Sequence, residues 1–471
     1  MRQGLVGRSL IGRSVSALAV IGMVLTGCSI AVVGNASPGA DQPRDVASGQ
    51  LTITGAVDDT VDRQVRDALV DITAFWQEQF PKAYGKPFAP LQGGYFSVDS
   101  RNIDEGAYPA TGIGCAQQPV EPEEVKDNAF YNPDCDAIAY DRQLLSELSK
   151  NYGRALPPIV LAHEFGHAVQ GRVGFASNGR SIQDETQADC FAGAWTAWVV
   201  GGHAQHLAIR EPQLDDVLRG YLTLSDPLGS DPNNDQAHGS FFDRVAAFSD
   251  GYDQGVPTCR DRFGADREFT AARFSSRQDY ADQGNSPFDE TIDIVGKTLP
   301  PFWTGLFPTS FGKDFVQPKI TSFNGSPPSC LASGGTDREL GYCAKDKTVY
   351  YDEKDLVRPA YQKLGDWAVA TAISLPYALA ARSEIGRSTD GPTAQRSAVC
   401  LSGWYTAQVY AKKFQDIAVL SPGDVDEAVE FLLVYGVKNE VFPNTNASGF
   451  ELLRAFRDGF LRGGTSCDVG L

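Results

Sequence analysis

Two histidines and a glutamate in one short stretch have the spacing of a hydrolytic metal site. His163 and His167 are four residues apart, with Glu164 between them. Residues four apart lie one turn apart on the same face of a helix, so both imidazoles can reach one metal ion. Glu164 lies about 100° around the helix from His163 and can reach a metal-bound water. The pattern predicts one Zn²⁺ ion bound by His163 and His167, with Glu164 as general base.

A second predicted helix offers the acidic ligand that two histidines still need. It is expected to open with a capping box at Ser181 and to close at Gly201. Glu185 and Asp189 lie one turn apart on one face of it. One carboxylate can be the third metal ligand while the other accepts the free N–H of a ligating histidine. Spacing alone leaves the choice between the two open.

The elements expected to position these residues are helices with a small sheet. Apolar residues three and four apart predict an amphipathic helix over residues 62–80, ended by Pro81. Alternation predicts short strands within residues 88–98 and at residues 137–140. A small sheet beside the active helix is expected, and an edge strand of such a sheet can hold an extended peptide by main-chain pairing.

The sequence also repeats itself. The pattern of Phe, Trp, Pro, Gly and Lys in residues 75–88 recurs in residues 302–315 at an offset of 227, and residues 247–259 recur in residues 455–467 at an offset of 208. A tandem duplication with loop deletions produces an offset that shrinks in this way.

Five segments follow from the repeat and from the composition of the termini. They are a signal peptide (1–27), a flexible tether (28–55), a domain with the metal motif (56–260), a linker (261–284) and a degenerate copy of that domain (285–471).

The second copy lacks the residues that carry chemistry. The positions of His163, Glu164, His167, Glu185 and Asp189 are occupied there, at an offset of 210, by Ile373, Ser374, Tyr377, Gln395 and Val399. The scaffold therefore does not need the five residues of the first copy, which points to a role in chemistry. We expect one active and one degenerate domain.

The cysteines fit the same duplication. One of the nine cysteines, Cys28, is expected to carry a lipid anchor. The other eight are Cys115, Cys135, Cys190, Cys259, Cys330, Cys343, Cys400 and Cys467. An even number in an exported chain indicates disulfides. The repeat favours the pairs Cys115–Cys135, Cys190–Cys259, Cys330–Cys343 and Cys400–Cys467. Cys190 lies beside the metal residues but is expected to be a staple, because Cys400 persists where those residues are absent.

The N-terminus has the pattern of a bacterial lipoprotein signal. Arginines at positions 2, 8 and 13 precede an apolar run over residues 15–25, and small residues precede Cys28 as in a lipobox. We expect a lipid anchor on Cys28 that holds the protein on the outer face of the cytoplasmic membrane. An ordinary secretory signal with an incidental cysteine is the alternative.

The charge excludes some partners. A net charge of −18 argues against nucleic acid and against electrostatic docking on anionic lipid. The oligomeric state is left open by the sequence.

Three motifs together resemble a known family. They are His-Glu-x-Gly-His-x-x-Gln from His163, Glu-x-Gln-Ala-Asp-Cys-Phe-Ala-Gly-x-Trp from Glu185, and His-Gly-Ser from His238 with a later Arg and Gly-Tyr. Over residues 125–260 the chain is similar to the neutral zinc metallopeptidases of bacterial envelopes, in the wider class that includes thermolysin. The resemblance implies a zincin-like fold, Glu185 as the third zinc ligand and Asp189 as the hydrogen-bond partner of a ligand.

Several further side chains have more than one interpretation. His238 is the best candidate for the oxyanion donor, since Asn446 occupies its place in the second copy, although a capping or buried histidine would look the same. Arg244 can brace Asp189 or the substrate, or form a surface salt bridge. His203 and His206 follow a helix end and are expected to be solvated.

The sequence therefore predicts an α+β, mainly helical protein with a zincin-like active helix, a small sheet and two tandem homologous domains. Its expected function is hydrolysis of a peptide or protein substrate by a zinc-activated water with Glu164 as base. The alternative is a non-catalytic envelope binding or scaffolding lipoprotein whose zinc site is vestigial or structural.

Overall fold

The computed structural model describes residues 51–115, 120–175, 180–333, 336–443 and 447–471. The predicted signal peptide and the lipidation residue Cys28 lie outside this part of the chain. The described residues belong to one compact unit. It is mainly helical with small sheets, which confirms the α+β class. Within the described ranges, no helix combines the length and the apolar character needed to cross a membrane.

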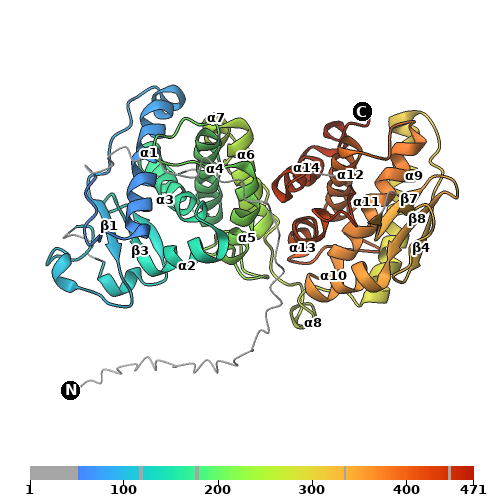
Figure 1. The fold of residues 1–471 in the computed structure, drawn as a ribbon, viewed down its shortest axis with the longest axis horizontal. Helices are drawn as coiled ribbons and strands as arrows, with labels where there is room; N and C mark the ends of the chain where they lie inside the picture. Colours follow the sequence, from blue (N-terminus) through green and yellow to red (C-terminus); the bar gives the residue numbers. More distant parts are fainter. Residues whose placement is uncertain (1–50, 116–119, 176–179, 334–335, 444–446) are drawn as a thin grey trace, which may run out of the picture. The chain divides into compact units, whose positions relative to one another are not determined.

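The N-terminal half begins with a long helix and a three-stranded sheet (Figure 1). These elements are α1 (Thr60–Tyr84), β1 (Gly94–Val98), β2 (Ala129–Asn132) and β3 (Ala137–Asp141). Strand β3 is central, parallel to β1 and antiparallel to β2. Strand β2 is therefore an edge strand.

A group of helices follows this sheet. They are α2 (Arg142–Tyr152), α3 (Leu156–Val173), α4 (Ser181–Val200), α5 (Leu214–Leu224), α6 (Phe241–Gln254), α7 (Val256–Asp261) and, further on, the short α8 (Arg277–Ala281). Helix α3 packs against α1, α2, α4 and β2. Because it is surrounded, its sequence is apolar on nearly every face rather than on one stripe.

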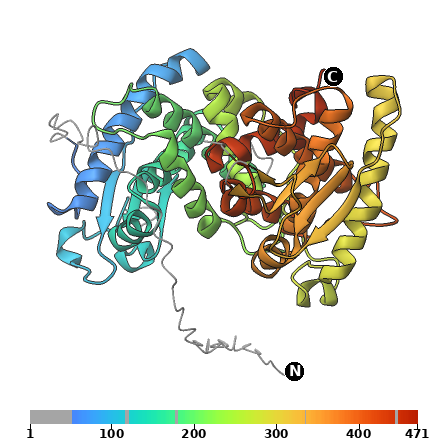
Figure 2. The same ribbon diagram turned by 45° about the vertical axis from the view of Figure 1, so that its right-hand side comes forward.

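The C-terminal half repeats this arrangement. Its main elements are α9 (Phe288–Phe311), β4 (Lys319–Phe323), β7 (Leu340–Cys343), β8 (Thr348–Asp352), α10 (Arg358–Lys363), α11 (Asp366–Glu384), α12 (Pro392–Tyr410), α13 (Asp424–Phe431) and α14 (Gly449–Arg462). Strand β8 is again central, parallel to β4 and antiparallel to β7. Figure 2 shows the orange strands beside the yellow helix α9, as does Figure 1.

The remaining elements are short. They are a two-stranded ribbon of β5 (Ala332–Ser333) and β6 (Thr336–Asp337), and the single turns η1 (Glu105–Ala107), η2 (Pro122–Val125), η3 (Glu211–Gln213), η4 (Glu353–Val357), η5 (Leu432–Gly436) and η6 (Gly463–Ser466).

Both halves contain one very close helix crossing. Helix α4 meets α6 where Gly193 faces the carbonyl of Phe248 and Gly251 faces the carbonyl of Cys190. Helix α12 meets α14 in the same way, at Gly403 and Gly459. A Cβ at any of these glycines would fall on main-chain atoms of the facing helix. Their backbones can therefore approach only because these positions carry no side chain.

The disulfides form the four expected pairs. Cys190–Cys259 and Cys400–Cys467 join α4 to α7 and α12 to the residue after η6, with Cα–Cα distances of 5.5 and 5.3 Å. The other pairs are Cys115–Cys135 and Cys330–Cys343. Cys190 thus forms a structural disulfide with Cys259, as expected.

The fold starts earlier than the predicted tether allows. Thr54 forms a parallel bridge with Phe96, donating its N–H to Tyr95 and accepting from Ser97. Ile53 is 6% exposed and belongs to the core. The predicted tether boundary at residue 55 is therefore wrong, because residues 53–55 extend the sheet next to β1.

Two predicted helix ends also need correction. Helix α1 continues through Pro81 to Tyr84 and ends at Gly85, which has a left-handed conformation. Proline removes one N–H near the end of the helix, while Phe80 and Ala83 keep packing into the core. Helix α4 has no side-chain cap at Arg180, so the predicted capping box at Ser181 is absent.

The predicted linker, residues 261–284, is partly packed on the N-terminal half. Phe263 is fully buried, and Gln183 donates its side-chain amide to the carbonyl of Gly264. Thr270 donates both its N–H and its hydroxyl to the carboxylate of Asp243. The polar composition of this segment reflects hydrogen bonding to the domain as well as solvent.

Candidate metal centre

The three residues of the first motif lie on α3, and α4 supplies the facing carboxylates. Gly166, between Glu164 and His167, faces the backbone of Ala188 on α4. A Cβ at Gly166 would lie 2.9 Å from the Ala188 Cα, closer than side-chain carbons approach. The glycine inside the motif therefore lets α4 come near enough for its carboxylates to reach the histidines.

Four possible ligand atoms, from three residues, lie close together between these helices. The Nε2 atoms of His163 and His167 are 3.1 Å apart. Oxygens of Glu185 lie 3.2 Å from His163 Nε2 and 3.4 Å from His167 Nε2. Ligands at 2.0–2.1 Å from a tetrahedral zinc ion are about 3.3–3.4 Å from one another. The spacing and the donor types of this trio fit one zinc ion with a fourth position open.

Asp189 orients the first histidine. Its Oδ1 lies 2.8 Å from His163 Nδ1, which leaves Nε2 of His163 to face Glu185. Arg244 holds this carboxylate with two hydrogen bonds, from Nε at 2.8 Å and Nη2 at 2.9 Å. Of the interpretations offered for Arg244, the structure selects bracing of Asp189, because its side chain is buried rather than at the surface.

Gln170, which had no predicted role, does the same for the second histidine. Its side-chain oxygen lies 2.8 Å from His167 Nδ1, and its amide group donates to the backbone carbonyl of Asp184 and to the side-chain oxygen of Gln187. The signal that could have found it is its spacing, since residue i+3 shares a helix face with His167. The corresponding residue of the second half, at offset 210, is Ala380.

The electrostatics of the cluster favour a cation. Burial works to lower the pKa of His163, but Asp189 and Glu185 raise it to about 10. Burial works to raise the pKa of Glu185, yet the two histidines hold it well below its usual value. Burial also works to raise the pKa of Asp189, while Arg244 and His163 keep that pKa lowered. The carboxylates therefore make a negative field at the point where the two Nε2 atoms meet.

Glu164 lies between this cluster and the edge strand. Its Oε2 accepts the N–H of Tyr131 on β2 at 2.9 Å, and burial raises the pKa of its carboxyl. The N–H of Tyr131 thus points toward α3 rather than toward β3. The edge of β2 that does not pair with β3 therefore faces the active helix.

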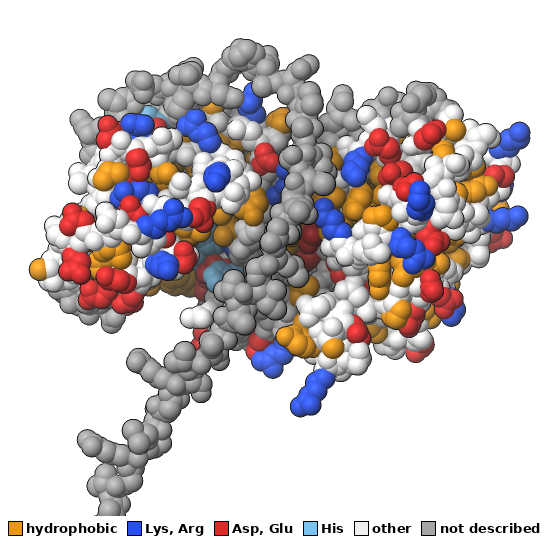
Figure 3. All heavy atoms as spheres, turned by 60° about the horizontal axis from the view of Figure 1, so that its bottom comes forward, with side chains coloured by type: hydrophobic (Ala, Val, Ile, Leu, Met, Phe, Trp, Pro, Cys, Tyr) orange, Lys and Arg blue, Asp and Glu red, His pale blue; other side chains and the backbone are white. Residues whose placement is uncertain are grey.

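A cleft of about 500 Å³ opens over the cluster. Besides the metal-site residues, its walls include Phe130 and Tyr131 of β2, Leu144 and Leu148 of α2, Thr223 of α5 and His238. The volume suits a segment of peptide rather than a single water. Figure 3 shows histidine side chains, in pale blue, in a hollow of the face that it views.

His238 lies at the wall of this cleft, half exposed, as an oxyanion donor would. Its Nδ1 is 3.2 Å from Asp226 Oδ1, and its backbone N–H donates to the same carboxylate. In the imidazolium form, with Nδ1–H on Asp226, its Nε2–H is available as a donor.

The two histidines that were expected to be solvated, His203 and His206, have different environments. His203 is exposed, as expected, and stacks on Trp198 with ring centroids 5.9 Å apart. His206 is 5% exposed, so the prediction that it is solvated is wrong. Its Nδ1 lies 2.8 Å from Asp71, whose carboxylate also accepts backbone N–H groups of residues 205–207. His206 thus attaches the loop after α4 to α1, and it does not line the cleft.

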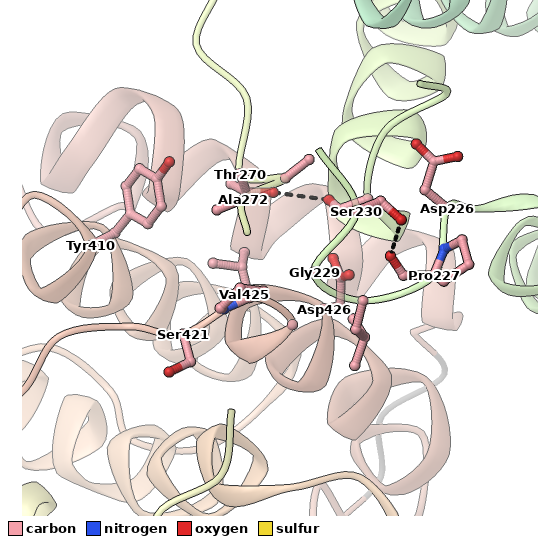
Figure 4. Close-up of a pocket in the computed structure, with 15 residues that line it drawn as sticks. Asp226, Pro227, Gly229, Ser230, Thr270, Ala272, Tyr410, Ser421, Val425 and Asp426 are labelled. Atoms are coloured by element: carbon pink, nitrogen blue, oxygen red, sulfur yellow. Dashed lines mark hydrogen bonds between the residues drawn. The ribbon is translucent and has the colours of Figure 1, made fainter. Parts of the chain in front are cut away.

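A second hollow, beside the segment that follows α5, is too small for a substrate. Its lining comes from residues 226–230, 240, 270–272, 410, 421–423 and 425–426 (Figure 4). The cavity volume is about 30 Å³, enough for roughly one water molecule.

The second half fills the corresponding metal position with uncharged side chains. Ile373 and Tyr377 stand at the histidine positions and are fully buried. Val399 and Leu452 stand, at offsets of 210 and 208, at the places of Asp189 and Arg244, and both are fully buried. The ion pair and the ligands are thus replaced together by buried, uncharged side chains.

Comparison with known proteins gives relatives without assigned functions. An uncharacterized protein of Mycobacterium tuberculosis is 29% identical over 180 residues, which are 33% of this chain and 59% of that protein. The uncharacterized protein YpfJ of Escherichia coli K12 is 26% identical over 179 residues, with shares of 33% and 58%. The chain thus spans about three fifths of the length of these relatives. No family model and no solved structure matches the chain.

The role of Gln170 leads to a first prediction. Replacing Gln170 with leucine removes the acceptor that orients His167, so we expect zinc affinity to fall about 10- to 100-fold. The measurement is competition between the purified protein and a chromophoric chelator. Gln170→Glu keeps an acceptor for Nδ1 and should retain tighter binding than Gln170→Leu. Equal zinc affinity of the wild type and Gln170→Leu would show that Gln170 does not orient a zinc ligand.

Proposed function

We propose that this chain is a zinc-dependent peptidase with one active half. The observation that carries the proposal is the trio of His163 Nε2, His167 Nε2 and Glu185, spaced by 3.1–3.4 Å at the base of a cleft of about 500 Å³. Two imidazoles and a carboxylate suit zinc and leave its fourth position open. The hypothesis rests on this geometry and on the motif spacing.

A zinc ion held by His163, His167 and Glu185 would polarise the scissile carbonyl and lower the pKa of a bound water to about 7. Glu164 takes a proton at its carboxylate and returns it to the leaving amine. The N–H of Tyr131 holds that carboxylate at the cleft, and burial, which raises its pKa, suits it to accept and release a proton. His238 donates from Nε2 to the developing oxyanion.

We assign the substrate to extended peptides. The edge of β2 that does not pair with β3 lies along the cleft, and its main-chain carbonyl groups can accept hydrogen bonds from a second strand, while the N–H of Tyr131 is bound to Glu164. Such pairing binds backbone rather than a particular side chain. The apolar walls of α2, at Leu144 and Leu148, favour an uncharged side chain beside the scissile bond.

The two halves fit a tandem duplication with a zincin-like first copy. Both have the helix–sheet–helix order, the same sheet topology, the same glycine-lined helix crossing and equivalent disulfides. In the second copy the chemical positions are filled by uncharged residues. It is therefore proposed to be a non-catalytic domain.

We further propose that Cys28 is acylated and that the protein is held at the outer face of the cytoplasmic membrane. The four disulfides agree with an oxidising compartment. The anchor itself rests on the N-terminal sequence pattern.

Metal analysis combined with a peptide library tests the function. We expect about one zinc per chain, cleavage of library peptides, loss of cleavage with chelator and recovery when zinc is returned. His163→Ala should lose both the zinc and the cleavage. Protein that holds stoichiometric zinc but cleaves nothing, with intact folding, would favour a binding or scaffolding protein with a structural zinc site instead.

A further inference from the structure

Three carboxylates converge inside the C-terminal half, away from the proposed zinc site. They are Asp366 at the start of α11, and Asp424 and Glu427 in the first turn of α13. One oxygen of each lies within 4.8 Å of an oxygen of the others. All three side chains are buried, with residue exposures of 3–5%.

Each carboxylate uses one oxygen to hold the backbone. Asp366 Oδ2 accepts the N–H of Ser286, Asp424 Oδ2 that of Ser421, and Glu427 Oε2 that of Trp367, each at 2.8 Å. The remaining oxygens of Asp366 and Asp424, both Oδ1, are fully buried and have no hydrogen-bond partner among the described residues. Buried oxygens of this kind normally have a partner, so these two indicate a ligand.

Within the described part of the chain, no basic side chain neutralises the group. Among the ion pairs there, none includes Asp366, Asp424 or Glu427. The charges that act most strongly on the three are their own and those of other carboxylates, including Asp279 and Glu430. Burial and this repulsion raise the pKa of all three acids. Buried like charges at this distance are costly without a cation.

The N-terminal half shows that the scaffold does not need acids here. At the same offset of 210 that relates α3 to α11, the three positions are occupied by Leu156, Leu214 and Val217. All three are fully buried, and Leu156 packs against α5. Three apolar residues that form a helix contact in the N-terminal half thus correspond to three carboxylates in the C-terminal half. At the proposed zinc site the difference runs the other way, because there the N-terminal half has the charged residues.

The backbone leaves room for this set. Gly365, with φ of 130°, precedes Asp366, and a Cβ there would collide with Glu427 Oε1 and with Asn285 Oδ1. Glu427 and Asn285 can therefore lie against the start of α11 only because residue 365 is glycine. Asn285 adds a neutral oxygen next to the carboxylates.

We propose that Asp366, Asp424 and Glu427 bind one Ca²⁺ ion that ties α11, α13 and the segment at Ser286 together. An all-oxygen, acidic set selects a hard cation over zinc. One oxygen of each side chain lies within 4.8 Å of the others, so all three can reach one ion. Ca²⁺ accepts irregular sets of protein oxygens, whereas Mg²⁺ requires a near-ideal octahedron and usually keeps several waters. The ion supports the fold of the non-catalytic half and takes no part in hydrolysis.

The test is calcium titration of the full chain, with zinc held constant. We expect Ca²⁺ to raise the melting temperature by about 5 °C once it exceeds the dissociation constant roughly 100-fold. Terbium, which replaces calcium, should give emission sensitised by Trp367, the neighbour of Asp366. The variant Asp366→Asn, Asp424→Asn and Glu427→Gln should lose both responses and, without calcium, should melt above the wild type because the repulsion is gone.

A second variant keeps the proposal testable if the amide variant folds poorly. Asp366→Leu, Asp424→Leu and Glu427→Val introduces the residues of the N-terminal half and should fold without responding to calcium. A wild-type protein that shows neither a melting shift nor terbium emission would overturn the proposal. So would an undiminished calcium response in either variant, and an equal response of the wild type to Mg²⁺ would overturn the choice of calcium.

Discussion

Replacing Glu164 with glutamine is expected to lower peptide hydrolysis by about 100- to 10,000-fold while leaving zinc bound. Glutamine keeps an oxygen that can accept the N–H of Tyr131, so the cleft should keep its shape. The substitution removes the carboxylate that would accept a proton from the attacking water. The measurements are zinc content, chelator competition and the rate of cleavage of a library-derived peptide.

Ser374 provides a matched control for that experiment. It occupies the position of Glu164 on α11, where its hydroxyl bonds to Ser402. Ser374→Ala should leave hydrolysis unchanged. If Glu164→Gln cleaves as fast as the wild type, Glu164 is not the base and the catalytic hypothesis fails. If both variants lose activity, the loss comes from the fold rather than from the base.

The second large effect concerns the helix crossing beneath the site. Gly251 on α6 faces the carbonyl of Cys190 on α4, and a Cβ would fall on that carbonyl. Gly251→Ala must push apart the two helices that hold Asp189 and Arg244 in contact. We expect a loss of about 3 kcal/mol or more in unfolding free energy, measured by urea and thermal unfolding.

Gly296 gives the opposite expectation for the same substitution. It lies exposed in the interior of α9, and a Cβ at this position would have no atom of another residue within 4 Å. Gly296→Ala should raise stability by roughly 0.5–1 kcal/mol, because alanine loses less backbone entropy in a helix. Tolerance of Gly251→Ala comparable to that of Gly296→Ala would contradict the close packing of α4 on α6.

Much of the fold followed from local patterns. The first motif lies on a helix, as predicted, and the helix of Glu185 and the strand at residues 137–140 were predicted close to their observed ranges. The errors arose where tertiary contacts outweighed a local signal. Pro81 did not end α1, since the packing of Phe80 and Ala83 continued past it. Residues 53–55 looked like tether, yet they pair beside β1.

Histidine burial shows the same limit. His206 follows a glycine pair in a polar segment, which is typical of a solvated loop. Its partner Asp71 lies on α1, 135 residues earlier. No local pattern can link residues so far apart, because the pairing depends on how α4 packs against α1.

The sequence by itself determined the chemical identity of the candidate site. The spacing of His163, Glu164 and His167 fixes three side chains on one helix, and comparison with residues 373–377 separates them from the scaffold. Helical spacing is a local property, so it can be read without the fold. The cysteine pairs followed equally from the repeat.

The tertiary structure decided which groups meet. It placed Glu185 opposite both histidines, and Asp189 behind His163 with Arg244 bracing it. It also revealed Gln170 behind His167 and the acids of α11 and α13 in one cluster. These relations depend on how closely helices pack, which is set by glycines such as Gly166 and Gly365. Helix packing brings together residues that are far apart in the chain, and a local sequence pattern carries no information about such contacts.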